Sequence, residues 1–132
     1  MLRTRLSNTP WFTILTEQQQ QRVIEDTQLQ EYPAGAFIVR KGDQSRHWIG
    51  VIEGLVRISV GTAGGKLASL TGVPPGGWIG EGALLKNELR RYDLVTLRDS
   101  SIAKMPIDTF YWLLDNSFTF NRFLLDQFNH RM

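Results

Sequence analysis

The chain has 132 residues, a net charge of +2, 21% charged residues and 42% hydrophobic residues. This composition is that of one globular domain, so it excludes intrinsic disorder, and the charge is too small to indicate nucleic-acid binding by itself. The chain has no cysteine, which excludes disulfides, iron–sulfur clusters and cysteine nucleophiles. No stretch approaches the roughly 18 apolar residues that span a bilayer, and no apolar segment follows the basic N-terminus. We therefore expect a soluble, cytoplasmic protein with no membrane contact.

The N-terminal part is predicted to be helical over residues 8–28. Thr16 is a candidate N-cap, because its hydroxyl can accept a hydrogen bond from the backbone of the next turn. Leu15, Val23 and Ile24 give a weak apolar stripe, and the glutamines at 18–21 form a solvated face. We expect this helical segment to precede the β-structure.

From residue 29 the pattern changes to short strands that are separated by turns. Strands are predicted at Phe37–Val39, in "HWIGVIEG" (47–54), "LVRISVGT" (55–62) and "LASLTGV" (67–73), and twice in "YDLVTLRDSSIAKM" (92–105). The predicted turns are at 32–35, at 41–43, in "TAGGK" (62–66), in "PPGG" (74–77) and at 98–99. Turn signals about every 8–12 residues indicate a sandwich, barrel or jelly roll.

After Pro106 the period of the apolar residues becomes helical. "IDTFYWLLD" (107–115) predicts one short amphipathic helix, and Ser117 is the predicted cap of a second. Phe120, Leu124 and Phe128 form a stripe along this second helix. No capping glycine or proline precedes its end at Met132, so we expect the chain to be cut before a further domain.

The segment "WIGEGALLKNELRRYDLVTL" (78–97) combines the features of an anion-binding loop. Gly80 and Gly82 allow a close approach of the backbone, and residues 83–86 can form a helical turn whose N–H groups face an anion. An arginine supplies the charge, and two are available, Arg90 and Arg91. On these grounds alone, a solvated turn with capping charges is the stronger alternative.

The order and spacing of several segments resemble the sensor domain of the Crp/Fnr family of bacterial transcription regulators. The matching segments are "YPAGAFIVRKGD" (32–43), "VIEGLVRISV" (51–60), "GK" (65–66), "PPGGWIGEGALL" (74–85), "RRYDLVTLRDSSIAKMP" (90–106) and "FYWLL" (110–114). The resemblance implies a mainly β fold with flanking helices, the cyclic-nucleotide-binding β-roll, an eight-stranded jelly roll or double-stranded β-helix. It implies one domain over 1–132, with N-terminal helices at 1–28, the roll at 29–106 and C-terminal helices at 107–132.

The resemblance also implies the residues of a phosphate cassette. By the family's spacing, Gly80 and Glu81 match the pair that holds the sugar and phosphate, and Arg91 matches the arginine that pairs with the cyclic phosphate. Gly82 and Ala83 are further candidates, as backbone donors. Tyr92 follows the arginine in the cassette, and Trp78 and Arg90 are secondary candidates. Tyr92 and Asp93 depart from the Ser/Thr-Ala of nucleotide-binding members, because they add bulk and a carboxylate near the phosphate.

The last helix resembles the helix through which the family forms parallel dimers. The expected interface residues of a homodimer are Phe120, Phe123, Leu124 and Phe128, and the alternative is that this helix packs back on the roll. The four tryptophans, residues 11, 48, 78 and 112, are expected to pack in a core or interface rather than to stack on a base. Trp78 is the exception to test, because it lies two residues before the cassette.

The function that the resemblance implies is the effector-sensing and dimerisation domain of a Crp/Fnr-like regulator. Its ligand would be a cyclic nucleotide such as cAMP or another small anionic effector, and DNA would bind only through a missing C-terminal helix-turn-helix. The alternative is a stand-alone β-roll interaction module with a degenerate, ligand-free pocket. A metal-dependent cupin-like enzyme would need a histidine cluster, which His47 and His130 do not provide, so we predict no metal site, no other cofactor and no enzymatic activity.

Overall fold

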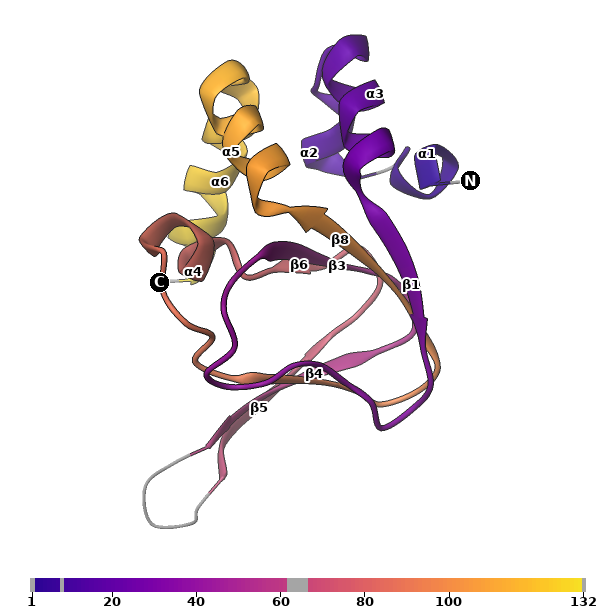
Figure 1. The fold of residues 1–132 in the computed structure, drawn as a ribbon, viewed down its shortest axis with the longest axis vertical. Helices are drawn as coiled ribbons and strands as arrows, with labels where there is room; N and C mark the ends of the chain where they lie inside the picture. The colour runs from indigo at the N-terminus through magenta and orange to yellow at the C-terminus, as the bar shows by residue number, and fades with distance from the viewer. Residues whose placement is uncertain (1, 8, 62–66, 132) are drawn as a thin grey trace. The chain divides into compact units, whose positions relative to one another are not determined.

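The computed structural model describes residues 2–7, 9–61 and 67–131. They divide into two compact units, a β unit formed by Gln28–Lys104 and a helical unit formed by Met1–Thr27 with Met105–Met132 (Figure 1). Within the described ranges, no helix is long and apolar enough to cross a membrane.

The β unit contains two four-stranded sheets. The first sheet has the order β1-β8-β3-β6 and the second the order β2-β7-β4-β5. The strands are β1 (Gln28–Tyr32), β2 (Phe37–Val39), β3 (His47–Glu53), β4 (Val56–Gly61), β5 (Leu67–Val73), β6 (Trp78–Ile79), β7 (Asp93–Thr96) and β8 (Ser100–Pro106). β4 pairs antiparallel with both β5 and β7, and β4 and β5 run side by side as a long hairpin (Figure 1). The predicted β-roll is confirmed.

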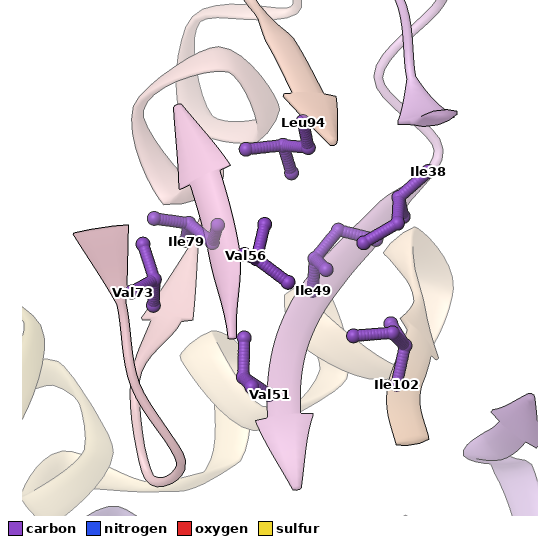
Figure 2. Close-up of a cluster of buried hydrophobic side chains, with 8 residues drawn as sticks. All are labelled: Ile38, Ile49, Val51, Val56, Val73, Ile79, Leu94 and Ile102. Carbon is purple, nitrogen blue, oxygen red and sulfur yellow. The ribbon is translucent and has the colours of Figure 1, made fainter. Parts of the chain in front are cut away.

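One apolar core holds the β unit together. Residues alternate between the two faces of a strand, so Ile49 and Val51 of β3 point to the same side. Figure 2 shows these side chains converging with others from β2, β4, β5, β6, β7 and β8, and the buried cluster consists of Ile38, Ile49, Val51, Val56, Val73, Ile79, Leu94 and Ile102. Each fully buried side chain of this kind contributes about 1.5–3 kcal/mol to folding.

The described residues of the helical unit form five helices around a cluster of aromatic rings. These helices are α1 (Leu2–Leu6), α2 (Pro10–Thr13), α3 (Glu17–Asp26), α5 (Ile107–Asn116) and α6 (Phe118–Arg131). The Phe120 ring packs edge-on against Trp11 and Phe110, with ring centroids 5.9 and 5.7 Å away. α3 and α5 are joined by the hydroxyl of Thr109, which donates to the Asp26 carboxylate at 2.8 Å.

This packing corrects the prediction that Phe120 and Leu124 belong to a dimer interface. Phe120 is fully buried and Leu124 is only 3% exposed within the single chain, so neither offers surface to a partner. Phe123 and Phe128 are half-buried, and their place in an interface stays a prediction.

The predicted N-terminal helix over residues 8–28 is two helices, α2 and α3. Thr16 is the reason, because an N-cap residue has extended backbone angles that interrupt a helix. Thr16 has φ −67° and ψ 161°, and it forms a capping box with Gln19, so the predicted cap is confirmed. The predicted cap at Ser117 is also confirmed, since its hydroxyl accepts from the backbone N–H of Phe120 at 3.1 Å.

Most predicted strands and turns are confirmed, including the turn at 74–77, where the Gly77 N–H donates to the Pro74 carbonyl at 3.1 Å. The predicted turn at 62–66 lies outside the described residues. The strand patterns did not predict β1, whereas α1 lies within the segment 1–28 in which the resemblance implied N-terminal helices. β1 has no alternating pattern, because its residues are exposed or half-buried, and it is recognisable only by its pairing with β8.

Candidate functional site

The candidate site begins at α4 (Glu81–Lys86), the short helix between β6 and β7. A helical turn was predicted at 83–86, and the helix starts two residues earlier, after Gly80. Gly80 has φ +104°, and a Cβ atom there would lie 2.3 Å from Nη1 of Arg90. The backbone conformation therefore favours glycine at this position, and any larger residue would displace the end of the Arg90 side chain.

Arg90 lies inside the β unit, with only 3% of its surface exposed. Its Nη2 donates to the backbone carbonyl of His47, while Nε and Nη1 have no hydrogen-bond partner among the described residues. Burial lowers the pKa of the guanidinium, and the neighbouring Tyr92, Asp43 and Glu81 act in the opposite direction. A buried cation with unpaired N–H groups costs free energy, so this side chain is suited to an incoming anion.

Arg91 lies in the opposite environment. Its side chain is 75% exposed, and its guanidinium is 3.2 Å from the carboxylate of Glu88. An exposed ion pair of this kind contributes at most about 1 kcal/mol. The structure therefore brings Arg90, rather than Arg91, against the start of α4.

The two residues that depart from the family pattern have structural contacts. Tyr92 is half-buried and packs against the apolar core of the β unit. Asp93 accepts a hydrogen bond from the backbone N–H of Lys41 at 2.7 Å, so its carboxylate holds the neighbouring turn. The carboxylate that was expected to disturb a phosphate is thus engaged elsewhere.

Glu81 fixes α4 to the first sheet. Its carboxylate is 98% buried and accepts a hydrogen bond from Nε1 of Trp48 at 3.1 Å. The Trp48 ring packs on Trp78 with centroids 4.7 Å apart, and a Cβ atom at Gly50 would lie 2.3 Å from the Trp78 ring. The predicted core packing of both tryptophans is confirmed. Gly82 and Ala83 follow in the first turn of α4, where backbone N–H groups have no partner within the helix.

Replacing Trp48 by phenylalanine is expected to destabilise the protein by about 1–3 kcal/mol, because a buried carboxylate loses a hydrogen-bond donor. Equilibrium unfolding in urea measures this loss. Trp112→Phe is the matched control, since Trp112 is half-buried and its ring packs under the guanidinium of Arg22 rather than against a carboxylate. Equal stabilities of Trp48→Phe and the wild type would contradict the anchoring role of Glu81.

The sequence analysis did not identify the cationic residues that accompany Arg90. Arg90 lines a hollow together with Arg46, His47 and Lys104. These residues come from three separate segments of the chain. A detectable signal was Lys104, which stands two residues after the buried Ile102 and thus on the same face of the strand. No group of three or more His, Asp or Glu side chains in the described part of the chain could hold a metal ion.

Comparison with known proteins identifies the family. The model of the cyclic nucleotide-binding domain matches residues 29–117. The catabolite activator protein of Thermus thermophilus is 24% identical with a TM-score of 0.80, and the match covers 92% of this chain and 57% of that protein. No curated protein matches the sequence.

Two further solved structures are similar. The sensor domain of the transcriptional regulator DNR from Pseudomonas aeruginosa is 18% identical with a TM-score of 0.87, covering 98% of this chain and 87% of that domain. The regulatory domain of Toxoplasma gondii protein kinase A, crystallised with cAMP, is 26% identical with a TM-score of 0.71, covering 83% of this chain and 42% of that one. The family model spans most of the chain and the β-roll is shared, so the chain belongs to the cyclic nucleotide-binding domain family and has the fold of Crp/Fnr sensor domains.

Proposed function

We propose that the chain senses a small anionic effector and that Arg90, not Arg91, binds the effector's anionic group. The observation that carries this proposal is the buried guanidinium of Arg90, which has two unpaired nitrogen atoms and lies against Gly80. An arginine that is already desolvated and fixed in place loses little conformational entropy when it binds an anion.

The start of α4 would complete the anion site. Two of its first backbone N–H groups, those of Gly82 and Ala83, are not used within the helix, and they favour a negative charge. We assign to Glu81 the role of positioning α4 through its hydrogen bond with Trp48. In this assignment, the contact with a sugar that the resemblance implied is not the main role of Glu81. Tyr92 borders the site, and its phenol favours the charged form of Arg90.

We further propose that the effector controls a larger regulator. An effector that binds one arrangement of the roll and its helices more tightly than another shifts the equilibrium between them. The half-buried Phe123 and Phe128 of α6 are the remaining candidates for a homodimer contact. DNA binding would require a helix-turn-helix beyond this domain, as in the Crp/Fnr regulators whose fold it shares.

One observation favours a second function, that of a ligand-free interaction module. Tyr92 stands where nucleotide-binding members have a small residue, and its ring packs against the core of the β unit. Such a ring takes up space that a nucleotide would need.

Titration calorimetry with cAMP, cGMP and cyclic-di-GMP separates the two functions. We expect one of these nucleotides to bind, and Arg90→Gln to weaken it at least about 30-fold, because a buried charge contact is lost. Arg91→Gln is the matched control and is expected to change the affinity less than about twofold. Circular dichroism verifies that both variants fold, and Arg90→Lys, which keeps the charge, is expected to retain part of the affinity. A larger effect of Arg91→Gln would contradict the assignment, and the absence of binding to all three nucleotides would favour the interaction module.

A further inference from the structure

The β unit contains a second feature of chemical interest, a hollow of about 380 Å³ with a cationic rim. Its rim carries Arg46, His47, Arg90 and Lys104, and Ile38 and Ile49 provide an apolar floor. None of the described residues that line it belongs to α4. We call this feature the cationic hollow; apart from Arg90, it uses different residues from the effector site proposed above.

The positive charges of the cationic hollow are only partly balanced by the described residues around it. Arg46 is bound to the neutral amide oxygen of Gln44 at 2.9 Å, and the Lys104 ammonium lies 5.1 Å from the centre of the Tyr32 ring. The described residues place no carboxylate within ion-pair distance of Arg46, Arg90 or Lys104. Like charges that share a small space repel one another unless an anion joins them.

The carboxylate of Asp43, which also lines the hollow, compensates for only one of these positive charges. Asp43 uses one of its oxygens to accept the backbone N–H of Arg40 at 2.8 Å, an interaction that holds the β2–β3 turn. Arg90 contributes the second, independent observation, since it lines the hollow, is 97% buried and leaves Nε and Nη1 without a described partner. The cationic hollow is therefore built from fixed groups and not only from surface charges.

We propose that the cationic hollow binds a dianion of the phosphate type through Arg46, Lys104 and His47, with Arg90 behind them. The hollow is lined by three permanent cations and by the carboxylate of Asp43, so its net charge of two positive units matches a dianion better than a single negative charge. The volume lies within the range of small-molecule sites, and the apolar floor can contact an organic body. The dianion is thus a free phosphate ion or the terminal phosphate of a small organic molecule.

His47 gives the proposed binding a dependence on pH. Burial lowers the pKa of its imidazole, followed by the charges of Lys104, Arg90 and Arg46. A bound dianion offsets these charges and raises the pKa again, so binding takes up a proton and becomes tighter as the pH falls from the pKa of His47 in the complex towards its lower pKa in the free protein. Of the elements around His47, β6 has no titratable residue. The charged groups near His47 are Arg46, Asp43, Arg90, Lys104 and, beyond Trp48, Glu81.

The test is a calorimetric titration of the protein with inorganic phosphate and, separately, with adenosine 5′-monophosphate. Lys104→Gln is expected to weaken binding about tenfold, because a charged hydrogen bond is lost. Arg98→Gln is the control, since it removes one charge from an exposed position that does not line the hollow. Phosphate binding that depends on Lys104 supports a free ion, and Lys104-dependent binding of the nucleotide alone supports a terminal phosphate. No binding of either probe, or binding that is equally sensitive to Arg98→Gln, would overturn the proposal.

Two further measurements test the role of His47 and separate the cationic hollow from the effector site. With sulfate, which keeps both charges over this pH range, the wild type should bind up to about tenfold more tightly per pH unit towards acid, and His47→Asn should remove this trend. A wild-type affinity for sulfate that does not change with pH would exclude His47 from the site. Lys104→Gln should leave cyclic nucleotide binding within about twofold of the wild type, so failure of the hollow and failure of the effector site are distinguishable.

Discussion

Replacement of Phe120 by alanine is expected to lower the free energy of unfolding by about 3–5 kcal/mol. The ring is fully buried and contacts Trp11 and Phe110 edge-on, so its removal leaves a cavity and breaks two aromatic contacts. Phe118→Ala, two residues earlier on α6, is the control. Its ring is 76% exposed, and we expect a change within about 0.5 kcal/mol.

Urea unfolding measures both variants, and sedimentation velocity measures their oligomeric state. The structure makes Phe120 a residue of the single chain's core, so Phe120→Ala should destabilise the fold whether or not the protein is a dimer. A variant that keeps the stability of the wild type but dissociates a dimer would contradict this placement and would restore Phe120 to an interface.

Replacement of Gly80 by alanine is expected to have the largest effect at the candidate site. Gly80 has φ +104°, and a Cβ atom would lie 2.3 Å from Nη1 of Arg90. Strain of this kind costs about 1–3 kcal/mol, and the displacement of the guanidinium should also weaken effector binding at least about tenfold.

Gly82→Ala is the matched control for Gly80→Ala. Gly82 lies two residues further along, in α4, where a Cβ atom would meet nothing within 4 Å. An alanine in a helix is better by about 0.5–1 kcal/mol than a glycine, so this variant should be slightly more stable than the wild type. Thermal unfolding and nucleotide titration compare the two variants. Equal effects of the two substitutions would contradict the close approach between Gly80 and Arg90.

The strands of the β unit were largely predictable from the sequence, because short apolar segments alternate with glycine, proline and aspartate at the turns. Which of Arg90 and Arg91 is buried was not predictable. Neighbouring residues of an extended chain point in opposite directions, so a shift of one residue exchanges a buried side chain for an exposed one. The burial of Arg90 depends on Gly80 and on the His47 carbonyl, which are distant in the sequence.

The surface that covers α6 was likewise not predictable from the sequence. The stripe of Phe120, Leu124 and Phe128 correctly indicated an amphipathic helix, but a stripe does not say which surface covers it. Trp11, more than 100 residues away, fills that place for Phe120. The cationic hollow was also beyond the sequence, since Arg46 and Lys104 meet only after β3 and β8 have joined the same sheet.

The measurement that tests the role of Arg90 most directly is an NMR titration of the arginine side chains. The Nε–H resonances of Arg90 and Arg91 are recorded while the protein is titrated with the nucleotide that binds most tightly in calorimetry. We predict that the Arg90 resonance is protected from solvent exchange before the titration and shifts during it, while the exposed Arg91 resonance exchanges rapidly and stays in place. A shift of Arg91 with no change at Arg90 would contradict the proposed anion site.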